Sequence, residues 1–346
     1  MIFLKLNSVL KIEVGIIDKI EEILKNSNIK GNFILVTDEV IYNLYGEKVI
    51  NQLKNISNVN VVYVKDNSLS YSISLAKMVI QNEIDNVVGL GGGRVLDVCK
   101  YAAYMSKKTF ISIPTTIAND GIASPIAVLK QDNGKVKSLG SKMADVILID
   151  TKLISEGPTS LIKAGIGDTI SNYMALIDWK LADMRGIEKI NDMAYLMSKE
   201  SLNTLMKTEY NSICLEFIEV LANSIVLSGV AMNIAGTSRP VSGSEHLFSH
   251  ALDFYTDNNN LHGLQVALGT VTMLKIINQD YSKVIDYLKK FDININPKNL
   301  NISEEDFIKC MIEAPKMRTN RYTYLNEIEL KEENLRKIYK ELVEEL

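Results

Sequence analysis

The three histidines of this 346-residue chain lie close together in the sequence, at His246, His250 and His262. His246 and His250 are spaced i, i+4, which places them on one face of a helix. Imidazole is the commonest protein ligand for transition metals. A lone histidine on an apolar helix is usually a core residue, but three together beside acidic residues predict a metal or catalytic site.

A catalytic metal site commonly uses three protein ligands and leaves a further position for substrate or water. Two histidines and one carboxylate would suffice. The spacing leaves Glu245, Asp253 and Asp168 open as the carboxylate. Asp168 follows two glycines at the start of a strongly helical run, where its alternative role is to cap the helix N-terminus.

A second set of candidate residues is the glycine run Gly91, Gly92 and Gly93, which stands between a strand pattern, NVVGL, and a helical pattern, RVLDVCKYAAYM. Glycines in such a turn let the backbone approach a ligand closely, and the free N–H groups and dipole of the helix favour a phosphate. Tight packing of the strand against the helix is the structural alternative. The run therefore predicts a pyrophosphate site.

Asp38 ends another apolar strand pattern, FILVTD, and precedes the glycines rather than following them as in the common dinucleotide fingerprint. A carboxylate just past a strand can accept hydrogen bonds from an adenosine ribose and disfavours a 2′-phosphate, so Asp38 favours NAD over NADP. Capping of the following helix is the alternative role.

Short β-branched runs alternate with helical patterns from residue 32 to 150. This rhythm predicts βαβ units and a parallel sheet covered on both faces. From about residue 153 the pattern becomes helical throughout. The chain is also long enough for two hydrophobic cores. We therefore expect an α/β domain at residues 1–152, followed by an all-α domain at residues 153–346.

Composition narrows the classes of partner. The formal charge is −4 and no long Lys/Arg run is present, which argues against nucleic acid and for a small ligand. The N-terminus alternates like a strand and lacks the features of a signal peptide, and we expect no uninterrupted membrane-spanning run. Cys99, Cys214 and Cys310 are scattered and apolar in context, which indicates unpaired thiols in a reducing cytoplasm.

Taken together, these segments resemble the glycerol-1-phosphate dehydrogenases, within the iron-containing alcohol dehydrogenase and glycerol dehydrogenase superfamily. The similarity covers nearly the whole chain and rests on GLGGGRVLDVCK (89–100), IPTTIANDGIASP (113–125), AGIGDTISNYMALIDWKLA (164–182), SRPVSGSEHLFSHALD (238–253), LHGLQVALGT (261–270) and RTNRYTYL (318–325). The resemblance implies a Rossmann-like parallel-sheet domain, a helical metal-binding domain of the dehydroquinate synthase-like fold, and a cleft between them.

The resemblance also implies roles for individual residues. The metal ligands become Asp168, His246 and His262, while His250 moves to a position near the substrate or nicotinamide. Asp120 reaches toward the reaction centre, and both it and His250 are candidates to bind hydroxyls or relay the alcohol proton. The cofactor contacts fall on Asp38, Gly92, Gly93, Arg94, Asp97, Thr115, Thr116 and Ser124.

Two positions depart from the family pattern. Leu264 stands where the motif after the third histidine usually has Glu, so one carboxylate is lost. Asn119 stands where many relatives carry histidine. The first departure bears on the preferred metal and on substrate affinity. The metal is open among zinc, nickel and iron, because all three accept this ligand set.

The resulting functional prediction is a metal-dependent NAD(P) oxidoreductase that interconverts dihydroxyacetone phosphate and sn-glycerol 1-phosphate. The alternatives are a glycerol dehydrogenase, a dehydroquinate-synthase-like lyase and a non-catalytic nucleotide-binding protein. A homo-oligomer is expected from base rates.

A substrate phosphate needs cationic donors, for which Arg239, Arg318 and Arg321 are available. Arg239 is favoured among them because it lies next to the helix with the metal-ligand histidine. Pairing with carbonyls or surface acids is the structural alternative for all three.

Overall fold

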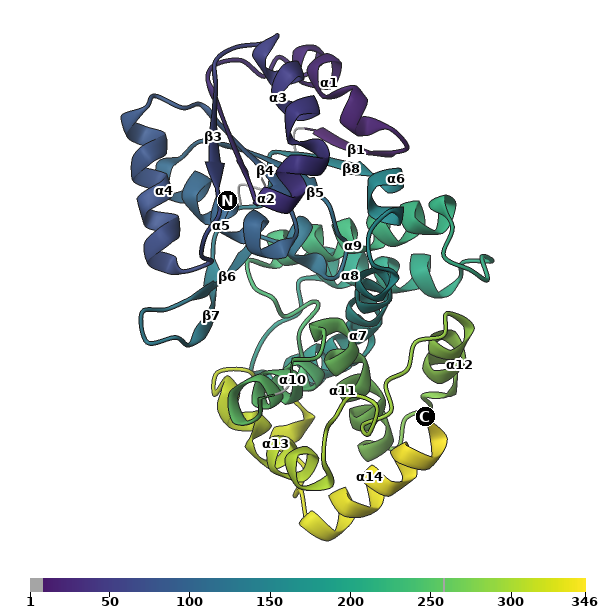
Figure 1. Cartoon of the computed structure of the whole chain (residues 1–346). Coiled ribbons are helices and arrows are strands. Elements are labelled where there is room, and N and C mark those ends of the chain that lie inside the picture. The colour runs from purple at the N-terminus through teal and green to yellow at the C-terminus, as the bar shows by residue number, and fades with distance from the viewer. Residues whose placement is uncertain (1–8, 258) are drawn as a thin grey trace. The chain divides into compact units, whose positions relative to one another are not determined.

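The computed structural model describes residues 9–257 and 259–346. The chain divides into two compact units after Thr159, a few residues beyond the boundary placed from the sequence. Figure 1 shows a sheet with flanking helices in the first unit and helices in the second. The expected strand pattern in residues 1–8 lies outside the described residues.

The first unit contains a six-stranded sheet in the order β1-β8-β5-β4-β2-β3, in which every strand pair is parallel. Runs of β-branched and apolar residues form its central strands, which are buried along their lengths because helices cover both faces. The prediction of a parallel sheet is confirmed. Its strands are β1 (Val9–Glu13), β2 (Phe33–Thr37), β3 (Val59–Tyr63), β4 (Asn86–Gly91), β5 (Thr109–Pro114) and β8 (Val146–Asp150).

The helices of the first unit lie on opposite faces of this sheet. Apolar residues of α1 and α3 form one core with alternate residues of the strands. Helix α5 packs on the other face, where a Cβ on Gly89 would lie 3.0 Å from Cys99 Sγ. The helices are α1 (Ile20–Asn26), α2 (Glu39–Ile41), the π-helical turn η2 (Tyr42–Gly46), α3 (Glu47–Lys54), α4 (Leu69–Gln81), α5 (Gly93–Ser106) and α6 (Thr151–Ser155).

A two-stranded antiparallel hairpin, β6 (Ile126–Lys130) and β7 (Val136–Gly140), was not predicted from the sequence. Its turn contains Asp132, Asn133 and Gly134, and Gly134 has a φ of 78°. An Asn-Gly turn between alternating residues is a strong hairpin signal, because glycine adopts this left-handed conformation without strain.

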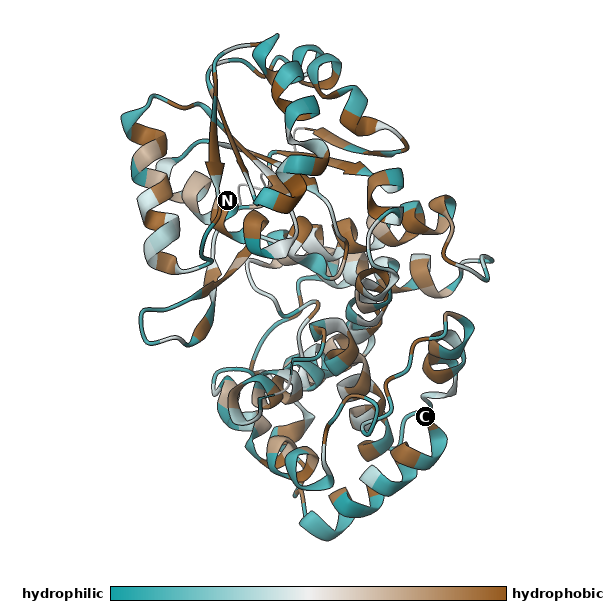
Figure 2. Ribbon diagram, viewed as in Figure 1, coloured by the Kyte–Doolittle hydropathy of each residue, from teal (hydrophilic) through white to brown (hydrophobic). Residues whose placement is uncertain are grey.

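The described part of the second unit consists of helices and their connections, as predicted. Its outer helices show the 3.6-residue apolar periodicity that buries one face, whereas its central long helices are buried on most sides. Figure 2 shows brown apolar faces turned inward and teal faces outward on its outer helices. Its helices are α7 (Thr159–Met184), α8 (Asp192–Met206), α9 (Leu215–Ala235), α10 (Ser244–Tyr255), α11 (His262–Ile276), α12 (Ser282–Lys290), α13 (Glu304–Met317) and α14 (Glu332–Glu345).

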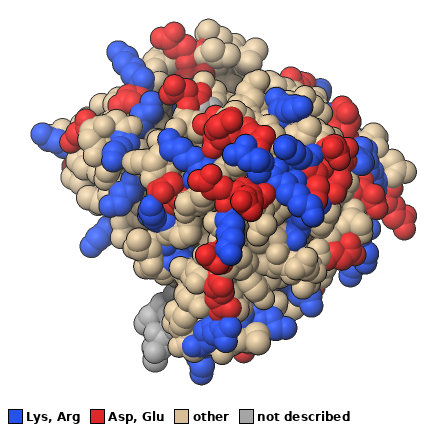
Figure 3. Space-filling model, turned by 90° about the horizontal axis from the view of Figure 1, so that it is seen from below, with Lys and Arg blue, Asp and Glu red and all other residues tan. Residues whose placement is uncertain are grey.

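The expectation that no segment is long and apolar enough to span a membrane does not hold for helix α9. By length and composition alone it would suffice, but 67% of its most apolar window is buried within the protein. Such burial is typical of a core helix. All three cysteines are free, as predicted, and Cys99 and Cys310 are buried. The face drawn in Figure 3 carries Lys and Arg interspersed with Asp and Glu.

Candidate metal centre and cofactor loop

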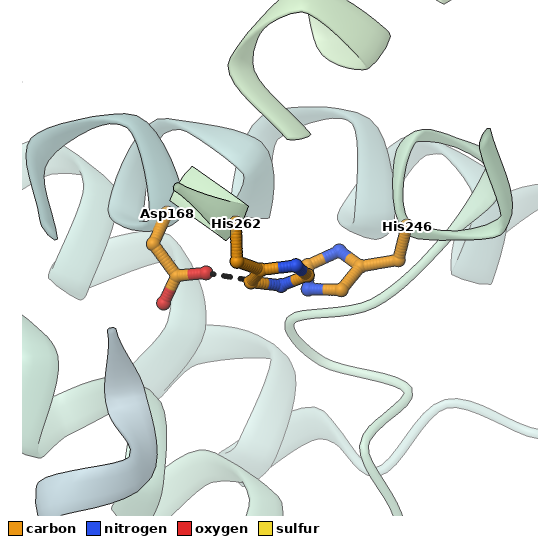
Figure 4. Close-up of side chains that lie close together, drawn as sticks. All are labelled: Asp168, His246 and His262. Carbon is orange, nitrogen blue, oxygen red and sulfur yellow. Dashed lines mark ion pairs between the residues drawn. The ribbon is translucent and has the colours of Figure 1, made fainter. Parts of the chain in front are cut away.

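Three side chains from three helices converge in the second unit. Asp168 of α7, His246 of α10 and His262 of α11 each place one possible ligand atom within 4.8 Å of the others. Oδ1 of Asp168 lies 3.6 Å from Nε2 of His262. Figure 4 shows the two imidazoles side by side, with the Asp168 carboxylate directed toward His262. The structure thus brings together the three residues that the family resemblance indicates as ligands.

Glycines let the helices approach closely enough to bring these side chains together. A Cβ on Gly167 would lie 2.3 Å from the carbonyl oxygen of Gly263, and a Cβ on Gly263 would lie 1.8 Å from that of Ala164. Real Cβ atoms cannot occupy such positions, so α7 and α11 cross with their backbones in contact. Asp168 and His262 each adjoin one of these glycines in the sequence and are therefore carried to the same crossing.

Asp168 lies in the interior of α7 rather than at its beginning. The alternative role proposed from the sequence, capping a helix N-terminus, is therefore wrong. Asp168 is 7% exposed, so its carboxylate is almost completely buried.

Glu245 orients the first imidazole. Its Oε1 accepts a hydrogen bond from the backbone N–H of Gly243 and another from Nδ1 of His246, each 2.7 Å long. Because the proton of His246 is then on Nδ1, the lone pair is on Nε2. Metal-bound histidines commonly use their second nitrogen in this way. Spacing alone left Glu245 open as a metal ligand. In the structure it is the hydrogen-bond partner of a candidate ligand, His246.

His262 is oriented by a longer chain of hydrogen bonds. Asp253 Oδ1 accepts from Nε2 of Gln265 at 3.1 Å, and Oε1 of Gln265 accepts from the Ser249 hydroxyl at 2.6 Å. Ser249 has only one hydroxyl proton, which is committed to Gln265. Its oxygen can therefore only accept from Nδ1 of His262, 3.1 Å away. The lone pair of His262 is thus on Nε2, the atom nearest Asp168.

Burial keeps these imidazoles uncharged. It lowers the pKa of His246 to about 3, with smaller contributions from the charges of Arg321 and Arg318. Burial also lowers the pKa of His262, with His246 adding to the effect. Metal binding requires neutral imidazole and ionised carboxylate. Two nitrogen lone pairs and a carboxylate converge within 4.8 Å, a donor set that fits a divalent transition metal.

His250 lies beside the other two histidines but outside this three-residue group. Its ring centroid is 6.2 Å from that of His246 and 6.5 Å from that of His262. Burial lowers its pKa well below the usual range, followed by the effects of both neighbouring histidines and two arginines. His250 is therefore a neutral hydrogen-bonding group next to the candidate metal ligands.

The glycine run forms the turn from β4 into α5 in the first unit. A Cβ on Gly91 would lie 2.9 Å from Val95, whereas a Cβ on Gly93 would meet nothing within 4 Å. Packing therefore explains Gly91, which is the alternative considered from the sequence. It does not explain Gly93, where open space lies in front of the first turn of α5. A phosphate fits this place because the first N–H groups of a helix lack intrahelical acceptors.

Other predicted cofactor residues line the same edge of the sheet. Strands β2, β4 and β5 are adjacent and parallel, so their carboxyl ends lie together. Thr115 follows β5 and donates its backbone N–H to the Gly91 carbonyl at 3.1 Å. A Cβ on Gly92 would lie 3.4 Å from Oγ1 of Thr116. Arg94, in the first turn of α5, is exposed.

Asp38 caps the helix that follows β2, as its alternative role predicts. Its Oδ1 accepts from the backbone N–H of Ile41 at 2.9 Å. This bond occupies one carboxylate oxygen and is compatible with a ribose contact, because a carboxylate has two oxygens and several acceptor sites.

Asp97 and Ser124 belong to a buried network around Lys100. The Nζ of this fully buried lysine lies 3.1 Å from Asp97 Oδ1 and 3.5 Å from Ser124 Oγ, and it also donates to the carbonyl of Ile126 at 2.6 Å. These contacts hold the segment after β5 against α5. Sequence reasoning did not single out Lys100, since a lysine in a helical pattern ordinarily lies in solvent.

Asp120 begins the short turn η3 (Asp120–Ile122) in this held segment. Burial raises its pKa to about 6, opposed by the positive charge of Lys100. Asn119 caps the same turn, with its Oδ1 accepting from the Gly121 N–H at 2.9 Å. The residue that departs from the family pattern therefore has a local structural role here.

Sequence reasoning also missed Ser249 and Gln265, which are both fully buried. The sequence held one signal for them: both are polar residues on otherwise apolar helical faces. A buried polar side chain requires a hydrogen-bond partner, so such residues point to a network. Their partners are on different helices and could not be read from spacing.

A family model described as iron-containing alcohol dehydrogenase matches residues 11–158. A glycerol-1-phosphate dehydrogenase [NAD(P)+] from Sulfurisphaera tokodaii is 36% identical over 341 residues, covering 96% of this chain and 95% of the relative. The corresponding protein from Methanosarcina mazei is 32% identical, covering 90% and 88%.

Solved structures share the fold. A probable glycerol dehydrogenase from Sinorhizobium meliloti has a TM-score of 0.76 at 18% identity, covering 98% of this chain and 97% of that one. The glycerol dehydrogenase of Schizosaccharomyces pombe has a TM-score of 0.78 at 17% identity, covering 96% and 88%.

Identity above 30% over nearly the full length of both chains places this chain in the glycerol-1-phosphate dehydrogenase family of the iron-containing alcohol dehydrogenases.

Proposed function

We propose that this protein catalyses the NAD(P)-dependent interconversion of dihydroxyacetone phosphate and sn-glycerol 1-phosphate. The observation that carries this proposal is the convergence of Asp168, His246 and His262 in a chain of this family. The substrate and the stereochemistry are taken from the relatives named glycerol-1-phosphate dehydrogenase. The two imidazoles and the carboxylate of the cluster support the metal dependence.

In this proposal Asp168, His246 and His262 hold one divalent ion, whether zinc, nickel or iron. Such an ion supplies Lewis acidity toward the oxygen of the reacting carbon. The protein contributes the orientation of its ligands. Glu245 and Ser249 fix the two imidazoles with their Nε2 lone pairs toward the common centre, so the site is preorganised before the ion binds.

The nucleotide cofactor is assigned to the carboxyl edge of the sheet, with its pyrophosphate at Gly92, Gly93 and the Arg94 amide. The bound nicotinamide supplies or accepts the hydride. The open space at Gly93 and the positive end of α5 support this placement. Asp38 supports NAD as the preferred form, because its carboxylate would repel a 2′-phosphate. Thr115 and Thr116 supply hydroxyls at the same edge.

Asp120 and His250 are assigned to the alcohol proton and the substrate hydroxyls. His250 is neutral at pH 7, so its ring offers one donor and one acceptor. Asp120 has a pKa of about 6, close to the range in which a carboxyl group exchanges a proton readily during turnover. We further propose a cytoplasmic homo-oligomer acting on small molecules.

The proposal is tested by following NADH oxidation by metal-reconstituted protein with dihydroxyacetone phosphate and with dihydroxyacetone. The His262→Ala variant is measured in parallel, and its circular dichroism is compared with that of the wild type. We expect strong preference for the phosphate in the wild type and loss of turnover in the folded variant.

The other outcomes identify the alternatives. Preference for the unphosphorylated ketone would reassign the protein as a glycerol dehydrogenase. No turnover of either ketone, with metal and cofactor both shown to be bound, would reject both dehydrogenases. Unchanged turnover in His262→Ala would reject the metal-dependent mechanism.

A further inference from the structure

Lys100 places a positive charge in the interior of the first unit. Its side chain is fully buried, although it belongs to the middle of α5, and lysine is almost never fully buried without a partner. Moving an ammonium group out of water is costly unless the charge is paired and hydrogen-bonded. The contacts of the Lys100 amine therefore indicate what this residue does.

The amine of Lys100 has three acceptors for three protons. Nζ donates to the Gly121 carbonyl at 2.8 Å and to the Ile126 carbonyl at 2.6 Å, and it lies 3.1 Å from Oδ1 of Asp97. The Ser124 hydroxyl, 3.5 Å from Nζ, itself donates to the Ile126 carbonyl. Only the ammonium form of lysine has three N–H donors. This set of acceptors therefore fits the charged side chain.

Two of these acceptors lie at the two ends of the segment that follows Asp120. Gly121 is the next residue in the turn η3, and Ile126 begins β6. Between them, the backbone N–H of Ser124 donates to the Asp120 carbonyl at 2.9 Å. Lys100 thus ties both the beginning and the end of this segment to α5. Because Asp120 belongs to the turn, its position depends on Lys100.

Lys100 is also the positive charge that acts on Asp120. Asp120 is the only charged residue between positions 109 and 129 of the sequence, so its charged partners come from other segments. After burial, which raises its pKa to about 6, the largest effects come from two groups of α5. The charge of Lys100 lowers the pKa of Asp120, and that of Asp97 raises it. One buried lysine therefore acts on both the position and the proton affinity of Asp120.

We infer that Lys100 is the positioning residue for Asp120: it ties the turn of Asp120 to α5 and supplies the positive charge that keeps the Asp120 carboxylate able to accept the alcohol proton near neutral pH. This inference rests on the proposed function. When glycerol 1-phosphate is oxidised, the hydride goes to NAD+ and the hydroxyl proton to the Asp120 carboxylate, and the reduction returns both. Lys100 acts through Asp120, without contacting the substrate.

The direction of the pH effect follows from the two charges. The ionised carboxylate accepts the proton during alcohol oxidation, so the rate falls as the pH drops through the pKa of Asp120. Removing the charge of Lys100 raises this pKa and moves the acid limb of the profile to higher pH. We expect a shift of at least about one pH unit, as for a carboxyl group that loses a nearby opposite charge. Removing the charge of Asp97 should move the limb to lower pH.

The test measures kcat/KM for glycerol 1-phosphate oxidation against pH with metal-reconstituted full-length protein. It compares the wild type with Lys100→Met, which keeps the length of the side chain, and with Asp97→Asn. Lys142→Met is the matched control, because this half-buried lysine of the same unit pairs with Asp145 and donates to the Lys108 carbonyl at 2.9 Å. It should lower stability without moving the limb. The phosphate of the substrate titrates identically in every comparison.

A further variant separates the charge from the hydrogen bonds and guards against a folding defect. Lys100→Gln keeps two N–H donors for the carbonyls but has no charge. Circular dichroism shows whether each variant is folded. We expect Lys100→Gln to show the same shift of the acid limb as Lys100→Met. Its loss of kcat should be smaller than the roughly 100-fold expected for Lys100→Met, in which the turn is no longer tied to α5.

The titration of Asp120 can also be followed without turnover. In protein labelled with ¹³C at the aspartate carboxyl carbons, the signal of Asp120 is the one that Asp120→Asn lacks. We expect it to titrate near pH 6 in the wild type and in Lys142→Met. It should titrate at higher pH in Lys100→Gln and at lower pH in Asp97→Asn.

The inference is overturned if Lys100→Gln leaves the acid limb and the Asp120 signal in place, or if Lys142→Met moves them equally. Failure of the proposed function is a separate result, in which the wild type does not oxidise glycerol 1-phosphate. The carboxyl titration then decides: an upward shift in Lys100→Gln supports the control of Asp120 by Lys100, and an unchanged titration rejects it.

Discussion

The two candidate binding regions are built by opposite means. The cofactor loop is one continuous segment, Gly91 to Gly93, and offers mainly backbone N–H groups at the start of α5. The candidate metal centre uses side chains from α7, α10 and α11, and each imidazole is fixed by a further side chain. A backbone site depends on the absence of side chains, whereas a side-chain site depends on the presence of particular ones.

This difference predicts how each region responds to substitution. In the loop, an added atom should impair binding and leave the fold intact, because space is open at Gly93. At the helix crossing, an added atom should disturb fold and metal binding together, because the same contacts serve both. The following predictions test that contrast, beginning with the largest expected effect.

His246→Ala and His250→Ala remove the same ring from one face of α10. We expect His246→Ala to lower metal affinity by more than the roughly 100-fold that loss of an outer partner costs, because it removes a ligand. His250→Ala should keep the wild-type metal content, measured by elemental analysis after dialysis. Equal loss of metal in both variants would show that the ligand set is wrong.

Gly263→Ala places a methyl group where the Ala164 carbonyl oxygen lies, so α7 and α11 must separate. We expect the free energy of unfolding to fall by about 3 kcal/mol, as in overpacked cores, with weaker metal binding. Urea unfolding followed by circular dichroism measures the first effect. Gly140→Ala is the control, because a Cβ there meets no atom within 4 Å. A neutral Gly263→Ala would contradict the backbone crossing.

Ser249→Ala removes the acceptor that fixes the proton of His262 on Nδ1, and leaves the three ligands in place. Metal affinity should fall about 10- to 100-fold, as for other outer partners of a bound histidine. The cobalt-substituted protein should also show an altered visible spectrum, which a general loss of stability would not produce. Ser224→Ala, which removes another buried hydroxyl, should leave both unchanged. Equal effects of the two substitutions would reject the orienting role.

Gly93→Ala should have the smallest effect. It should weaken cofactor binding without destabilising the fold, in contrast to substitutions at the candidate metal centre. The methyl group enters open space where the pyrophosphate is assigned, so NADH affinity should fall about tenfold through steric overlap. Unfolding free energy should be unchanged or higher by up to about 1 kcal/mol, since alanine restricts the unfolded chain. Titration of NADH by fluorescence measures binding. Unchanged affinity would place the pyrophosphate elsewhere.

Much of the fold could be predicted because its signals are local. Apolar β-branched runs marked the strands of the parallel sheet, and helical periodicity marked α4, α5 and α7. The β6–β7 hairpin was missed although Asn133 and Gly134 marked its turn, because β7 is mostly exposed and lacks an apolar β-branched run. The break between α8 and α9 was also missed, since residues 201–234 keep a helical pattern throughout.

The site residues that could be predicted were likewise those with a local signal in the sequence. The clustering of three histidines and the position of the glycines after a strand were visible in the sequence. Spacing could not choose among Glu245, Asp253 and Asp168, and family resemblance was needed to favour the last. The structure gives the physical basis of that choice: Glu245 orients His246, Asp253 ends the hydrogen-bond chain to His262, and Asp168 alone faces both imidazoles.

By itself, the sequence determined the alternation of strands and helices, the helical second half and the chemical types available for a site, because these depend on neighbours along the chain. Only the tertiary structure decided which side chains meet. Gly167 and Gly263 are far apart in the sequence, yet their lack of side chains lets two helices touch and sets Asp168 against His262. The Ser238 hydroxyl likewise accepts hydrogen bonds from Arg318 and Arg321, which lie about 80 residues further along the chain. Such pairings depend on contacts between distant helices, and no local pattern encodes them.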